Sequence, residues 1–284
     1  MREDMLNKFS CLVPVYNNAK YLKLALESIK DFAYEIFIVE GSWNKDLPAR
    51  STDGTIDVIK DFLRTSSVAE KTTVIYYDPV EGEDHRTNTY NPNVLYNQIR
   101  AKQMAVKNMT GDWMMMVDSD EIYKSADLNN LDKYLYNFKI TSEFFIFRMP
   151  AFVFYFNHEF GTREHFTRIS RILSHPVELT WEDQVLPPND FCELNNLDIP
   201  TDVCYMYHYG YPSIERAVSK MNMWRDDVTT DWINAFIGRV ERGDLIEGEN
   251  YHLFAEKLGY GQAFETFKGT HPECVDRTLK NNEL

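Results

Sequence analysis

The chain has 284 residues, of which 44% are apolar and 14% aromatic, so it is long and apolar enough to bury a sizeable core. Its formal net charge of −14 disfavours a nucleic-acid-binding surface, which needs a basic stripe, and an anionic membrane as a partner. Because no segment approaches the roughly 20 apolar residues of a membrane span and the N-terminus lacks an apolar signal core, we expect a soluble, cytoplasmic protein without a transmembrane segment.

The first part of the chain alternates between short apolar runs and helical patterns. Apolar runs of strand length occur at residues 9–15, 36–40, 72–77 and 113–117. The expected helices between them contain Leu22, Ala25, Leu26 and Ile29, then Ile56, Ile59 and Leu63, and finally residues 92–108. Strands without polar alternation, separated by helices, predict a mainly parallel sheet that helices cover on both faces.

Polar residues follow or end three of these expected strands. Tyr16 and Asn17 follow the first strand, Glu40 ends the second, and Asp118-Ser119-Asp120 follows the fourth. In parallel α/β sheets, ligands bind beyond the carboxyl ends of the strands. The sequence therefore predicts a ligand site at one edge of the sheet.

The second part of the chain has a mixed pattern. Aromatic-rich strand candidates occupy residues 144–156, 166–173 and 203–209, and helical spacing dominates from Ser213 onward. No internal repeat and no long linker divides the chain. We therefore expect one α/β domain at residues 1–212 and a C-terminal helical extension at residues 213–284 that packs on it.

The stretch from Gly111 to Glu121 ends an apolar run abruptly at three carboxylates. Asp118 and Asp120 point the same way if the extended geometry continues past Val117, because side chains on a strand alternate between its faces. Two hard oxygen ligands side by side can hold Mg²⁺ or Mn²⁺ and leave positions for water and phosphate oxygens. The alternative is a solvated turn after a core strand.

Five motifs follow one another between residue 9 and about residue 225. The most specific is Gly111-Asp112-Trp113, followed by an apolar run and Asp118-Ser119-Asp120-Glu121. The others are Val13-Pro14-Val15-Tyr16-Asn17; Glu40-Gly41-Ser42 with Ser51-Thr52-Asp53-Gly54-Thr55, split by an insertion at residues 43–50; Trp181-Glu182-Asp183; and His208-Tyr209-Gly210-Tyr211 with Lys220-Met221. Together they resemble glycosyltransferase family 2, which has the GT-A fold of nucleotide-diphospho-sugar transferases.

This resemblance implies a GT-A type sheet in which residues 1–125 bind the nucleotide and residues 126–212 the acceptor. The implied enzyme is a metal-dependent, inverting hexosyl- or N-acetylhexosaminyl-transferase that moves a sugar from a nucleotide-diphosphate donor, with a UDP-sugar favoured, to a glycan or other hydroxyl acceptor. The implied ligands of Mn²⁺ or Mg²⁺ are Asp120 and Asp118, with His208 or its rival His271. The implied donor-binding residues are Pro14, Tyr16, Asn17, Glu40, Ser42, Asp53, Arg100, Asp118, Ser119 and Lys268.

Several of these residues have expected roles. An inverting transfer needs a general base near the acceptor hydroxyl. We favour Asp183 as this base, although the motif also aligns with Glu182 in that role. A carboxylate at Glu40 can accept the N–H of uracil. Glu121 is expected to point away from the site or to cap the following segment.

The basic residues leave alternatives open. His208 can complete a carboxylate metal site, whereas the rival reading lets Lys268 and His271 close over the diphosphate as a C-terminal lid. Candidates for contacts to phosphate or acceptor are Arg100, Arg168 and Arg171, for which simple solvation is the alternative.

Three other functions compete with sugar transfer. An aspartyl-phosphate phosphohydrolase would carry its D-x-D motif on the first strand. A sugar nucleotidyltransferase of related fold would need a glycine-rich basic loop after that strand, where residues 16–20 contain no glycine. A non-catalytic carbohydrate-binding protein could stack sugars on Trp181, Tyr207, Tyr209 and Tyr211. Detection of released nucleoside diphosphate separates this last case from an enzyme.

Overall fold

The computed structural model describes residues 5–82, 92–138, 144–155, 158–164, 170–174, 178–179, 185–186, 194–211, 213, 216 and 264–281. The first elements are β1 (Phe9–Val15), α1 (Ala19–Ile29), β2 (Glu35–Glu40), α2 (Thr55–Thr65), the short 3-10 helix η1 (Ala69–Lys71), β3 (Thr72–Tyr76), α3 (Pro92–Val106) and β4 (Trp113–Met116). They are followed by β5 (Glu121–Tyr123), α4 (Ser125–Tyr136), β6 (Phe144–Arg148), β7 (Ala151–Tyr155), β8 (Phe160–Glu164), β9 (Ser170–Ser174) and β10 (Glu178–Leu179). The last described elements are β11 (Val185–Leu186), β12 (Leu194–Asp198), β13 (Met206–Tyr211), β14 (Phe264–Thr266) and α8 (Glu273–Lys280).

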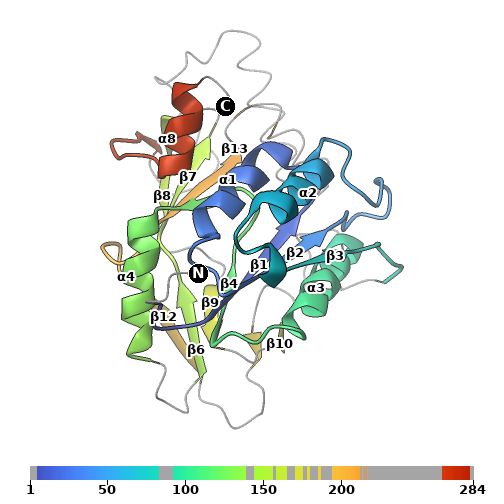
Figure 1. The fold of residues 1–284 in the computed structure, drawn as a ribbon, viewed down its shortest axis with the longest axis horizontal. Coiled ribbons are helices and arrows are strands. Elements are labelled where there is room, and N and C mark those ends of the chain that lie inside the picture. Colours follow the sequence, from blue (N-terminus) through green and yellow to red (C-terminus); the bar gives the residue numbers. More distant parts are fainter. Residues whose placement is uncertain are drawn as a thin grey trace.

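A seven-stranded sheet in the order β12-β6-β9-β4-β1-β2-β3 forms the centre of the fold (Figure 1). β1 pairs in parallel with both β2 and β4, and β2 pairs in parallel with β3. β9 runs antiparallel between β4 and β6. The predicted mainly parallel sheet is therefore confirmed, and the expected strands of the first half coincide closely with β1 to β4.

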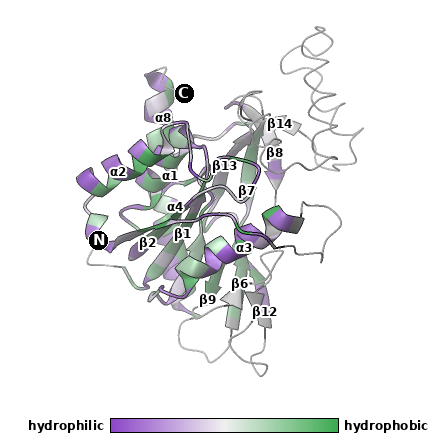
Figure 2. Ribbon diagram, turned by 90° about the vertical axis from the view of Figure 1, so that its right-hand side faces the viewer, coloured by the Kyte–Doolittle hydropathy of each residue, from purple (hydrophilic) through white to green (hydrophobic). Residues whose placement is uncertain are grey.

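Helices cover both faces of this sheet, which explains why its strands show no polar alternation. Cys11 and Val13 pack against Leu22 and Leu26 of α1, in the same cluster as buried residues of α2 and α4. Leu12, between them on β1, instead joins the cluster that contains buried residues of α3. Apolar residues accordingly concentrate on the strands between the helices (Figures 1 and 2).

A second sheet, in the order β14-β8-β7-β13-β5, lies beside the central one and was not predicted as a separate unit. The expected strand region at residues 144–156 splits between the sheets, because β6 joins the first sheet and β7 the second. Aromatic side chains of the second sheet, among them Phe154 and Tyr209, pack in one cluster with Tyr21 of α1 and Val275 of α8. The second sheet thereby attaches the C-terminal segment to α1.

The C-terminal extension is described only in part. Residues 217–263, where helical spacing dominates, lie outside the described residues. The described segment 264–281 contributes strand β14, which pairs with β8, and helix α8. The boundary near residue 212 stays a prediction. Within the described part of the chain, no helix has the length and apolar character needed to cross a membrane.

Candidate active site

The carboxyl ends of β1, β2 and β4 meet at one edge of the central sheet (Figure 1). Two contacts join these ends. The side-chain amide of Asn18 donates to the Ser119 hydroxyl over 2.8 Å, and Gly41 N donates to the Val15 carbonyl over 3.2 Å. Ser119 and its neighbour Asp120 are both buried at this edge. The structure therefore brings together the residues that were predicted to form the site from three separate motifs.

A tight turn leads from β4 into β5. Glu121 N donates to the Asp118 carbonyl over 2.9 Å and closes this turn. The extended geometry therefore ends before Asp118, and the condition under which Asp118 and Asp120 would point the same way is not met. Asp118 pairs with Arg171, whereas Asp120 pairs with a different arginine, Arg216.

Arg171, on β9, is 3% exposed and lies between two carboxylates. Its Nη2 lies 3.0 Å from Asp118 Oδ2 and also contacts Glu121 Oε1. The other oxygen of Glu121 accepts the backbone N–H of Asp118 over 3.1 Å and the Tyr123 hydroxyl over 3.4 Å. Glu121 is fully buried and supports the turn through these contacts, and its expected place, pointing away from the site or capping the following segment, stays a prediction.

The two carboxylates differ in their protonation behaviour. Burial raises the pKa of Glu121 well above its ordinary value, and Arg171 only partly opposes this effect. Burial also acts to raise the pKa of Asp118, but Arg171 and Lys102 together outweigh it and lower this pKa. Asp118 is therefore the member of the pair that keeps its negative charge at neutral pH.

Asp120, which is 2% exposed, meets a different basic group at each oxygen. Its Oδ1 lies 3.3 Å from His208 Nε2, on β13, and its Oδ2 accepts from Arg216 Nη2 over 3.2 Å. His208 Nε2 is buried and has no hydrogen-bond partner among the described residues. A buried imidazole nitrogen beside a carboxylate oxygen suits a divalent cation. No group of three or more His, Cys, Asp or Glu suited to a metal occurs in the described ranges, so this pair offers two protein ligands.

His271, the rival metal ligand, has different neighbours. Its Nδ1 lies 2.7 Å from the Tyr209 hydroxyl, and its ring packs against Phe154 and Phe267. Burial lowers the pKa of His271, which favours its neutral form. Of the two histidines, the structure thus places His208 beside Asp120. Lys268, on the same segment as His271, is exposed.

Glu40 is fully buried beneath the inserted loop at residues 43–50. Its Oε1 accepts the backbone N–H of Ser51 over 2.8 Å. Its Oε2 lies 3.7 Å from Arg50 Nε and has no hydrogen-bond partner among the described residues. The Arg50 guanidinium in turn lies over the Tyr76 ring, 5.4 Å from the ring centroid. One carboxylate oxygen therefore holds the loop, and the other is buried beside Arg50.

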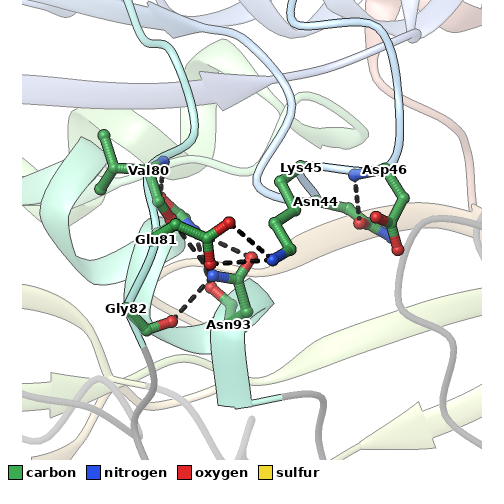
Figure 3. A network of polar contacts seen from close by, with 8 residues as sticks. Asn44, Lys45, Asp46, Val80, Glu81, Gly82 and Asn93 are labelled. Atoms are coloured by element: carbon green, nitrogen blue, oxygen red, sulfur yellow. Dashed lines mark hydrogen bonds and ion pairs between the residues drawn. The ribbon is translucent and has the colours of Figure 1, made fainter.

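The inserted loop is connected to the loop after β3. Lys45 Nζ lies 2.8 Å from the Glu81 carboxylate, as Figure 3 shows. Asn93, on α3, donates to the carbonyls of Val80 and Gly82 over 3.2 and 2.8 Å. The two loops and α3 are therefore connected to one another beside the ends of β2 and β3.

Other predicted donor-binding residues have clear local roles. Asp53 caps two helices, since it accepts the backbone N–H of Ala19 over 2.9 Å and that of Thr55 over 3.0 Å. The Tyr16 hydroxyl donates to the Pro48 carbonyl over 2.8 Å and fastens the inserted loop to the turn after β1.

Asn17 and Ser42 shape the backbone on the same side. Asn17 has a positive φ of 46°, and its side-chain oxygen accepts the backbone N–H of Thr52 over 2.8 Å. The buried Ser42 hydroxyl donates to the Asn44 carbonyl over 2.8 Å. Pro14 is buried within β1, whereas Arg100 is exposed on α3.

The predicted base and some of its neighbours lie outside the described residues. These are Glu182 and Asp183, together with Trp181, Arg168 and Lys220. The assignment of the base therefore stays a prediction.

Two site residues were missed in the sequence. Asn18 stood in a predicted turn, and the only available signal was its place next to Asn17. Arg216 follows His208 by eight positions and carries no motif. Its contact with Asp120 joins residues 96 positions apart in the sequence.

A comparison with protein families identifies the family of this chain. The family described as "Glycosyl transferase family 2" matches residues 10–159, more than half of the chain. The chain belongs to glycosyl transferase family 2. The predictions of this family and of a glycosyltransferase enzyme are therefore confirmed. A comparison with the curated proteins found no match.

Among solved structures, this family 2 glycosyltransferase is similar to TarS of S. aureus. TarS 1–349 matches with a TM-score of 0.43 and 17% identity over 80% of this chain and 69% of that one. The complex of TarS 1–349 with UDP-GlcNAc matches with a TM-score of 0.42 and 17% identity, over 87% and 75%. A longer TarS structure matches with a TM-score of 0.41 and 18% identity, over 80% of this chain and 42% of that one.

Proposed function

We propose that this glycosyltransferase uses a nucleotide-diphosphate sugar, with UDP-sugars favoured, and transfers the sugar to a hydroxyl group of a glycan or similar acceptor. The observation that carries the proposal is the Asp120–His208 pair, which lies at the carboxyl ends of the parallel strands in a member of this family. Ligands of α/β sheets bind at such ends. The nucleoside would lie toward β2 and the diphosphate toward β4.

Asp120 and His208 are the residues that would hold Mn²⁺ or Mg²⁺. The carboxylate oxygen and the buried, unbonded imidazole nitrogen fit such a cation, and the remaining ligands would come from water and the diphosphate. When bound, the cation would stabilise the negative charge that develops on the leaving diphosphate. Asp118, held in place by Arg171, would contact the ribose.

Glu40 supports the preference for uridine. Its buried Oε2 can accept the N–H of a uracil ring, while its Oε1 remains bound to Ser51. The Tyr76 and Arg50 pair on the neighbouring strand end supplies a flat surface beside this oxygen. The donor base would therefore be read at the end of β2.

The transfer itself needs one displacement. The acceptor oxygen bonds to the anomeric carbon as the bond from this carbon to the diphosphate oxygen breaks, and the hydroxyl proton passes to a carboxylate base. We propose Asp183 as the base, with Glu182 as the alternative. A single displacement of this kind inverts the anomeric centre.

A thermal-shift panel of nucleotides and nucleotide sugars, with and without Mn²⁺, tests the proposal, because ligands that bind the native state raise its stability. Uridine donors should raise the midpoint of thermal unfolding more than the other ligands do, and they should do so only when Mn²⁺ is present. Glu40→Gln should weaken the binding of UDP by about 1–3 kcal/mol and leave the binding of inorganic diphosphate unchanged, because only the uracil base loses a hydrogen-bond partner.

Glu35→Gln is the matched control for Glu40→Gln, since Glu35 lies at the other end of β2 and bonds Ser10 and Thr110. This control should bind UDP as the wild type does. Equal weakening of UDP and diphosphate by Glu40→Gln would show that Glu40 supports the loop and does not read the base. A panel without any stabilising nucleotide would contradict the proposed function.

A further inference from the structure

Arg216 connects the turn after β1 with the turn at residues 118–121 after β4, which we call the acidic turn. Its Nη1 donates to the Asn17 carbonyl over 3.1 Å, and its Nη2 donates to Asp120 Oδ2 over 3.2 Å. Its Nε is buried and has no hydrogen-bond partner among the described residues. The guanidinium thus lies at the strand ends where a diphosphate would bind, and one of its donors is unused.

The two arginines of the site are held differently. Arg171 is 4% exposed in its side chain and contacts both Asp118 and Glu121, so it is fixed between two carboxylates. Arg216 is 14% exposed in its side chain and, within the described part of the chain, pairs with one carboxylate, Asp120, which it shares with His208. Removing Arg216 from Asp120 would therefore leave that carboxylate beside His208, whereas removing Arg171 would leave the fully buried Glu121 without the partner of its ion pair.

The charges around Asp120 give Arg216 a role that Arg171 does not have. A buried carboxylate is costly without a positive neighbour, and Arg216 supplies one when no cation is bound. A divalent cation held by Asp120 and His208 would repel the guanidinium and take over its role at Asp120. The released nucleoside diphosphate carries one more negative charge than the intact donor, and a guanidinium suits its phosphate oxygens.

We propose that Arg216 is an exchangeable counter-ion: it neutralises Asp120 in the ligand-free enzyme and transfers to the diphosphate when a divalent cation occupies Asp120 and His208. This inference rests on the proposed function, because it requires the cation and the diphosphate. Arg216 and the cation would compete for Asp120, but they would cooperate in holding the nucleoside diphosphate product.

Calorimetry of the full chain separates these two effects. Arg216→Gln should bind Mn²⁺ alone about 5- to 10-fold more tightly than the wild type, because a competing positive charge is lost. The same variant should bind UDP about 10- to 100-fold more weakly at saturating Mn²⁺, because a charged hydrogen-bond donor is lost. Arg216→Lys, which keeps the charge, should bind Mn²⁺ as the wild type does and guards against a folding defect of Arg216→Gln.

Arg148→Gln is the matched control, since Arg148 also pairs with an aspartate, Asp198, at 2.7 Å, but on β6 and the neighbouring edge strand β12. It should change neither affinity. Weaker binding of both Mn²⁺ and UDP to Arg216→Gln, or unchanged Mn²⁺ binding, would overturn the exchange and leave the proposed function intact. A wild type that binds UDP but no Mn²⁺ would overturn both the metal assignment and the exchange.

Discussion

Asp183→Asn is expected to slow sugar transfer by about 10²- to 10⁴-fold while leaving donor affinity unchanged, as typical for loss of a positioned general base. The amide keeps the shape of the side chain but cannot take the proton of the acceptor hydroxyl. Initial rates of nucleoside diphosphate release, compared with calorimetric affinity for the donor, measure the two quantities separately.

Glu182→Gln is the internal control for this substitution and should be the milder of the two. The reverse order would identify Glu182 as the base. If neither variant loses activity while the donor still binds, the acidic pair does not catalyse the transfer. The stereochemistry of the product provides an independent test, since retention of the anomeric configuration would exclude a single displacement.

Arg171→Gln is expected to lower the free energy of unfolding by about 3–5 kcal/mol, because it leaves the fully buried Glu121 and the partly exposed Asp118 without their shared counter-ion. Denaturant unfolding measures this loss. The matched Arg148→Gln variant breaks a more exposed pair with Asp198 and should cost only about 0–1 kcal/mol.

A second substitution keeps the Arg171 prediction testable. Adding Glu121→Gln to Arg171→Gln removes one of the two uncompensated carboxylates and should recover part of the lost stability. A loss for Arg171→Gln no larger than that of the Arg148 control would show that Arg171 is not the principal counter-ion of the acidic turn.

The edge of the sheet was predictable because its signals are local. The expected strands ended at Val15, Glu40 and Val117, and the parallel order of such strands places their ends together. The order of the motifs also predicted the family. The sequence left His208 and His271 as rival metal ligands, and the contact of His208 with Asp120 favours His208.

The charge network was not predictable because it is formed by distant residues. Asp118 and Asp120 diverge at a turn whose closing hydrogen bond leaves no sequence signal. Arg171 reaches Asp118 only because β9 inserts antiparallel beside β4. Arg216 reaches Asp120 from a segment beyond β13, and the second sheet that positions β13 showed only a general aromatic pattern.

The role of Glu40 was predictable only in part. Its place at the end of β2 was predicted, but the eight-residue insertion that covers it gave no indication of its own conformation. In the structure this loop is fastened by the contact of Ser51 with Glu40 and by two contacts between residues more distant in sequence, Tyr16 with Pro48 and Lys45 with Glu81. The proposed recognition of the base and the support of the loop therefore depend on the same side chain.

Calorimetric titration of UDP into the wild type and into Asp120→Asn, each with Mn²⁺ and with EDTA, tests most directly whether this enzyme binds its donor through a metal at Asp120. We expect tight binding only for the wild type with Mn²⁺, and weakening of roughly 10- to 150-fold in Asp120→Asn, because one ligand and one compensating charge are lost. Equal affinity for UDP in EDTA and in Mn²⁺, or unchanged affinity in Asp120→Asn, would contradict the account.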